Sequence, residues 1–99
     1  MSTAATNKKV IAITGASSGI GKETAKQLVN NGFNVALLAR SEDKLRALVE
    51  ELGNDVAFAV KADVSDFKDV DTAFKKVSKH FGRIDGIFAN AGRGAKAAG

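Results

Sequence analysis

Apolar and polar positions along the chain follow two alternating patterns. Short apolar runs rich in β-branched residues are typical of strands buried on both faces of a parallel sheet, and they occupy residues 9–14, 34–39, 56–61 and 84–89. Between them, apolar residues recur at helical spacing, and these stretches occupy residues 19–31, 42–52 and 66–81. The pattern therefore predicts the order β-α-β-α-β-α-β.

Residues at the ends of the helical stretches support their boundaries. Ser41 and Ser65 precede the second and third stretches, where a serine side chain can cap the first free backbone N–H groups. Gly53 and Gly82 follow the last apolar positions, where glycine readily ends a helix. We expect each serine to act as an N-cap.

Strands that alternate with helices through short connections predict an α/β fold with a parallel sheet and right-handed crossovers. Periodicity alone allows the strand orders 3-2-1-4 and 2-1-3-4, the second being flavodoxin-like. We favour 3-2-1-4, a Rossmann-like half, because of the glycine motif described below. We expect a disordered lead-in at residues 1–8, a dinucleotide-binding domain at 9–92 and a flexible tail at 93–99.

Composition narrows the classes of function. The chain has 99 residues, no cysteine and one histidine, which excludes a disulfide scaffold, a cysteine-ligated zinc site and a thiol nucleophile. No apolar run approaches the ~20 residues of a membrane span, and the first residues lack the apolar centre of a signal peptide, so we expect a cytoplasmic protein. The net charge is only +4.

The densest basic cluster does not indicate nucleic-acid binding. Lys75, Lys76, Lys79 and His80 lie at the end of a predicted helix that begins with several aspartates. This order of charges complements the helix dipole, so a solvated helix face explains it.

The segment from Thr14 to Gly21, Thr-Gly-Ala-Ser-Ser-Gly-Ile-Gly, joins the first predicted strand to the first helix. A phosphate bound there meets free backbone N–H groups and the positive end of the helix. Gly15 permits the sharp turn, Gly19 permits close approach of a ligand, and Gly21 permits packing of the helix on the strand. Hydroxyl donors come from Ser17 and Ser18.

The Gly-x-x-x-Gly-Ile-Gly spacing resembles that of the short-chain dehydrogenase/reductase family. Asp63-Val64 resembles the family's adenine-contacting pair, and Asn90-Ala91-Gly92 resembles its second signature. Ala89 stands where the family often has another asparagine. The resemblance, together with the charge argument below, implies these cofactor-binding residues: Gly15, Ser17, Ser18, Gly19, Ile20, Gly21, Arg40, Asp63, Val64, Asn90, Ala91 and Gly92.

Two of these residues have alternative interpretations. Asp63 could instead support the start of the helix near Ser65. In the family, Asn90 mainly holds the central strands together, so structural support is as good an expectation for it as contact with the ligand.

The residue after the second strand indicates which dinucleotide is bound. An acidic residue there would bind the ribose 2′-hydroxyl of NAD, whereas Arg40 matches the 2′-phosphate of NADP. We therefore favour NADP over NAD. The alternative is a surface ion pair between Arg40 and Glu42 or Asp43.

Members of the family use a Ser-Tyr-Lys set for catalysis, and this chain contains no tyrosine. We therefore expect no catalytic residue and no activity in these 99 residues. The resemblance implies the NADP(H)-binding portion of an oxidoreductase whose full-length form transfers hydride between nicotinamide and a carbonyl or alcohol. The alternative is a truncated or engineered half-Rossmann scaffold that folds or self-assembles without activity.

The strand predicted at residues 84–89 lies at the edge of the sheet in the order 3-2-1-4. Its sequence, Ile-Asp-Gly-Ile-Phe-Ala, has no proline or lysine, the residues that commonly protect an edge. We expect Ile87 or Phe88 to be poorly covered and a second copy to pair along this edge, giving a homodimer or larger assembly.

Overall fold

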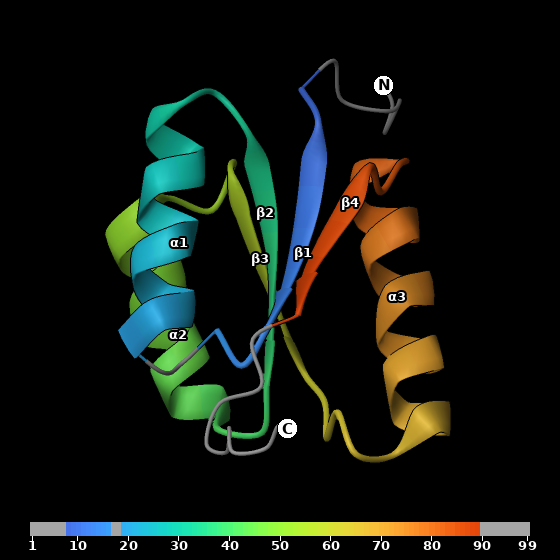
Figure 1. Ribbon diagram of the computed structural model, residues 1–99. Helices are drawn as coiled ribbons and strands as arrows, with labels where there is room; N and C mark the ends of the chain where they lie inside the picture. The colour runs from blue at the N-terminus through green and yellow to red at the C-terminus, as the bar shows by residue number, and fades with distance from the viewer. Residues whose placement is uncertain (1–7, 17–18, 90–99) are drawn as a thin grey trace.

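Residues 8–16 and 19–89 are described by the computed structural model of the chain (Figure 1). Strands and helices alternate in the predicted order. The elements are β1 (Val10–Thr14), α1 (Gly19–Asn30), β2 (Asn34–Ala39), α2 (Glu42–Leu52), β3 (Ala57–Lys61), α3 (Phe67–Phe81) and β4 (Gly86–Ala89).

The four strands form one parallel sheet in the order β3-β2-β1-β4, which confirms the predicted order and excludes the flavodoxin-like alternative. β1 lies inside the sheet, where Ile11 pairs with Val35 of β2 on one side and with Gly86 of β4 on the other. Parallel strands end at the same edge of a sheet, so the segments that follow the strands gather along one edge.

The two faces of the sheet are covered by different helices. α1 and α2 lie over one face and α3 lies over the other (Figure 1). Side chains alternate between these faces along β2: Leu37 packs in the core beneath α1 and α2, whereas Leu38 packs in the core beneath α3. Both side chains are fully buried, as a strand covered on both faces requires.

The core beneath α3, which we call the α3 core, uses the helical stripe seen in the sequence. Val77 and Phe81 of this stripe are buried, and Phe74 is partly buried against them. The Phe81 ring also meets the ring of Phe58 on β3 edge to face, with centroids 6.3 Å apart. This single helix supplies the apolar cover of its face in the described part of the chain.

Two predicted helix caps differ in the structure. Ser41 occupies the N-cap position of α2, but its side chain makes no capping hydrogen bond. The prediction that Ser65 caps α3 was wrong, because the cap is Asp66, whose side chain accepts from the N–H groups of Lys68 and Asp69. Both residue types can cap, and the turn that precedes α3 places Asp66 rather than Ser65 at the helix start.

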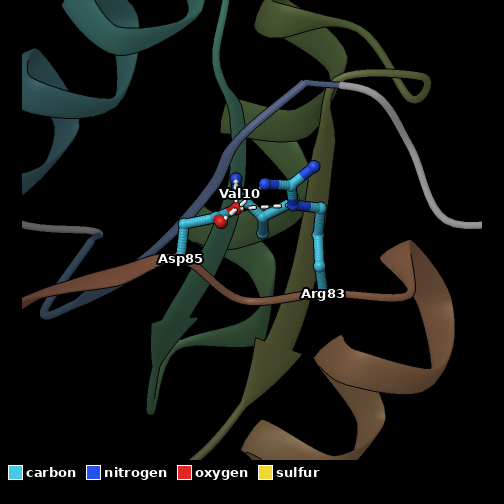
Figure 2. A network of polar contacts seen from close by, with 3 residues as sticks. All are labelled: Val10, Arg83 and Asp85. Carbon is cyan, nitrogen blue, oxygen red and sulfur yellow. Dashed lines mark hydrogen bonds and ion pairs between the residues drawn. The ribbon is translucent and has the colours of Figure 1, made fainter.

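β4 begins two residues later than predicted because Asp85 pairs with β1 in a different way. Its backbone N–H donates to the Val10 carbonyl at 2.8 Å, while its side-chain Oδ2 accepts from the Val10 N–H at 2.8 Å. Arg83 donates two hydrogen bonds to the same carboxylate, from Nε to Oδ2 at 2.8 Å and from Nη2 to Oδ1 at 2.7 Å (Figure 2). A side-chain carboxylate thus takes the place of a strand carbonyl at this end of β4.

The hydrogen bonds from Arg83 and from the Val10 N–H, in that order of importance, lower the pKa of Asp85. Hydrogen bonding to the ionised form favours that form. The carboxylate is therefore charged throughout the neutral range, which keeps it an acceptor for both donors.

β4 is poorly covered, as the sequence indicates. Ile87 and Phe88 are 54% and 37% exposed, whereas the β1 residues that pair with them are fully buried.

In the described residues, no helix is long and apolar enough to cross a membrane.

Candidate dinucleotide site

The turn between β1 and α1 lies at the edge where the strands end. Gly15 adopts a φ of 66°, in the left-handed region that favours glycine. The next residue, Ala16, is fully buried and its N–H donates to the Leu38 carbonyl of β2 at 3.1 Å. The chain therefore turns sharply at Gly15, as predicted, and the turn is held against the neighbouring strand.

The start of α1 is open and carries no acidic side chain. A Cβ added to Gly19 would meet no atom within 4 Å. The missing side chain therefore leaves open space at the helix start, and glycine is not needed there to avoid a clash with the described residues. Ile20 is 68% exposed, whereas Gly21 is buried. The first turn of α1 contains no aspartate or glutamate, so no acidic group there offsets the positive end of the helix dipole.

Arg40 and Asp63 lie at the same edge, after β2 and β3. The Ala62 N–H donates to the Ala39 carbonyl at 2.9 Å, which continues the pairing of these strands up to the two residues. Arg40 is exposed and forms no ion pair with any described residue. The alternative that Arg40 pairs with Glu42 is not supported, because Glu42 faces Arg46 at 3.5 Å.

Asp63 is held by its own loop. Its Oδ1 accepts from the hydroxyl of Ser65 at 2.6 Å and from the Ser65 N–H at 3.0 Å, and its own N–H donates to Asp69 Oδ2 at 2.7 Å. The side-chain hydrogen bond from Ser65 is the largest cause that lowers the pKa of Asp63, followed by the backbone hydrogen bond, with a smaller contribution from the charge of Arg40. Asp63 therefore does shape the loop before α3, although Asp66 is the cap.

Of the remaining predicted site residues, only Val64 lies in the described part of the chain. Val64 follows Asp63 and is 48% exposed. The last described strand residue, Ala89, pairs with Thr14 at the end of β1. Ser17, Ser18, Asn90, Ala91 and Gly92 lie outside the described residues.

Comparison with known proteins decides the family. The sequence profile described as short chain dehydrogenase matches residues 9–98. The chain belongs to this family.

Relatives of this short chain dehydrogenase chain are oxidoreductases by name. An uncharacterized oxidoreductase of Staphylococcus haemolyticus is 45% identical over 84 residues, which is 85% of this chain and 36% of the relative. The chain thus spans about a third of the length of the curated relatives that it matches.

Solved structures of the family share the fold. A 3-ketoacyl-(acyl-carrier-protein) reductase from Brucella melitensis, complexed with NADH, has a TM-score of 0.76 at 38% identity, over 80% of this chain and 32% of that one. An actinorhodin polyketide ketoreductase with NADPH has a TM-score of 0.82 at 34% identity, over 95% of this chain and 37% of that one.

Sequence reasoning missed the supports of the site in this short chain dehydrogenase chain. The sequence predicts that Ser65 caps the helix, whereas in the structure its hydroxyl donates to Asp63. The sequence indicates Asp69 only as one of the acidic residues at the start of α3, whereas in the structure it accepts the Asp63 N–H. Lys22 of α1 lines a groove of about 290 Å³ with Lys44 and Glu51 of α2. The regular spacing of the aspartates at positions 63, 66 and 69 indicates hydrogen bonding around the start of α3. The spacing alone does not indicate which carboxylate accepts from which N–H group.

Proposed function

We propose that this chain binds the adenosine-phosphate part of a nicotinamide dinucleotide at the edge where its strands end. The observation that carries the proposal is the turn from β1 to α1. There Gly15 is in the left-handed conformation, space is open over Gly19, and the first helical turn has no acidic residue. Free N–H groups at a helix start are suited to a phosphate. Family membership and relatives solved with NADH or NADPH support the same ligand class.

We propose NADP rather than NAD as the preferred dinucleotide. Arg40 follows β2, is exposed and is not engaged in an ion pair with a described residue, so its guanidinium is available to a 2′-phosphate. Guanidinium groups donate two hydrogen bonds in the geometry that phosphate accepts. The family neighbours do not decide this point, because one was solved with NADH and another with NADPH.

Calorimetric titration of adenosine 2′,5′-bisphosphate against AMP tests the ligand and the preference together. We expect the wild type to bind the bisphosphate more tightly and R40D to prefer AMP, because the substitution replaces attraction with repulsion at the 2′-phosphate. R46D is the matched control, since Arg46 is exposed and pairs with Glu42. It should keep the wild-type preference. Equal affinities in the wild type would refute the role of Arg40, and binding of neither nucleotide would refute the site.

In a longer protein of this family, we propose that the site serves hydride transfer between nicotinamide and a carbonyl or alcohol. The cofactor supplies the hydride, and the residues present here hold its adenosine end. The 99 residues contain no tyrosine and so lack the acid that the family uses. We expect no NADPH-dependent carbonyl reduction by this chain above the uncatalysed rate, measured by absorbance of NADPH. Turnover that co-purifies with the chain and is lost in G15V would contradict this.

As an assembly state, we propose a homodimer that pairs along β4. Ile87 and Phe88 are exposed on an edge strand that lacks lysine and proline. Antiparallel pairing across a two-fold axis would join two four-stranded sheets into one. This state is also what the alternative function, a self-assembling half-Rossmann scaffold, requires.

Sedimentation velocity at micromolar concentration tests the assembly. We expect a dimer for the wild type and a monomer for I87K, because a lysine on this face opposes pairing. F67K is the control, since Phe67 is 84% exposed and belongs to α3 rather than to β4. A wild-type monomer, or a dimer that I87K leaves intact, would refute the proposed interface.

A further inference from the structure

Asp69 reaches back from the first turn of α3 to the loop that carries Asp63. Its Oδ2 accepts the Asp63 N–H at 2.7 Å, and the side chain is half-buried rather than solvated. This contact joins a helix to the residue at the end of β3, six positions earlier in the chain. It therefore fixes the backbone from which the Asp63 side chain extends.

Neighbouring carboxylates do not share this task. Asp66 accepts from two N–H groups of α3 and so caps the helix. Asp71 pairs with Lys75 at 3.3 Å on the exposed side of the helix. In the described residues, Asp69 is thus the carboxylate that holds the Asp63 backbone. The same residues contain no group of three or more His, Asp or Glu side chains that could hold a metal ion.

The two oxygens of the Asp63 carboxylate differ in the hydrogen bonds that they accept. Both donors of Ser65, the N–H and the hydroxyl, fall on Oδ1. Among the described residues no hydrogen bond falls on Oδ2. A carboxylate whose rotamer is fixed through one oxygen offers the other as an acceptor in a defined direction.

We propose that Asp69 is a positioning residue for purine recognition, holding Asp63 so that its Oδ2 accepts from the exocyclic amine of adenine. This inference rests on the proposed function. An ionised carboxylate only accepts, so it favours adenine, whose ring carries an amine at position 6, over hypoxanthine, which carries a carbonyl there. Loss of the Asp69 contact frees the Asp63 backbone and weakens that discrimination.

The ratio of AMP affinity to IMP affinity measures this discrimination while keeping the ribose and phosphate constant. Hydrogen bonds to charged groups correspond to about tenfold or more in affinity, so we expect the wild type to prefer AMP by about tenfold. We expect D69A to bring the ratio close to one. D69N should retain the preference, because an amide oxygen also accepts the Asp63 N–H.

D71A is the matched control, since it removes a carboxylate from the same helix without a contact to Asp63. It should keep the wild-type ratio. If D69A does not fold, D69E keeps the charge near the helix start but displaces the carboxylate, and it should lower the ratio. A purely structural role would leave the AMP-to-IMP ratio unchanged in every folded variant.

The outcomes separate the inference from the function on which it rests. A wild type that binds AMP over IMP, with D69A or D69E keeping that ratio, overturns the role of Asp69 and leaves the proposed site standing. A wild type that binds both nucleotides equally overturns base recognition by Asp63, and the inference with it. A wild type that binds neither refutes the proposed function itself.

Discussion

Truncation of Phe81 tests whether α3 is packed on its face of the sheet. Phe81 is 5% exposed in the α3 core and meets the rings of Phe58 and His80 edge to face. Phe67 is 84% exposed at the other end of the same helix. The two residues thus offer the same substitution at a buried and at an exposed position of one element.

F81A removes a buried ring and leaves a cavity, which costs about 3–5 kcal/mol of unfolding free energy. Domains of this size have about 5–15 kcal/mol in total, so the variant loses a large share of its stability. A loss of about 3 kcal/mol corresponds to a fall of roughly 12–24 °C in the unfolding midpoint. F67A should stay within about 0.5 kcal/mol of the wild type, because its ring is in solvent.

Urea unfolding followed by far-ultraviolet circular dichroism at a fixed protein concentration measures both variants. The chain has no tryptophan or tyrosine, so helix signal is a more suitable probe than fluorescence. Equal losses for F81A and F67A, or a loss below about 1 kcal/mol for F81A, would refute the packing described for this face.

Four further substitutions test local features by unfolding measurements. D66A should cost about 1 kcal/mol because it removes a helix cap, whereas S41A should cost little because Ser41 makes no capping bond; comparable losses would contradict this. G15A should cost about 1–3 kcal/mol because of its φ of 66°, and a neutral result would argue against that turn. Asp85 has a lowered pKa, so its stabilisation is complete above about pH 4 and lost as the pH falls through the lower folded-state pKa. The stability of D85N should therefore approach that of wild type in acid, and a constant difference across pH would exclude the linkage.

Much of the fold was accessible from the sequence because its signals are local and agree with one another. The apolar runs and the helical stripes gave the order of elements, and the glycine turn distinguished the two possible strand orders. Val77 and Phe81 are among the apolar positions at helical spacing in the predicted stretch 66–81, and both are buried in α3. Each of these features depends on spacing within one segment.

Other features depend on geometry that residue type does not specify. Ser65 and Asp66 can both cap a helix, and the turn geometry assigns the cap to Asp66. Pairing of the Asp85 side chain with Val10 joins residues 75 positions apart, so no local pattern could indicate it. At the candidate site, sequence motifs predict roles for Gly15 and Asp63, whereas the contact between Asp63 and Asp69 depends on the path of the loop.

The position of β1 has a consequence for the order in which the sheet can form. β2 follows β1 closely in the chain, whereas β4 reaches β1 only after Val10 and Asp85, which lie 75 positions apart, have come together. Contacts at large sequence separation slow folding because the entropy of closure is spent before the contact forms. We therefore expect β1, β2 and β3 to assemble with α1 and α2 first, and β4 to dock last. Until then one side of β1 is an unpaired edge, and the rate of β4 docking determines how long that edge is exposed to other chains.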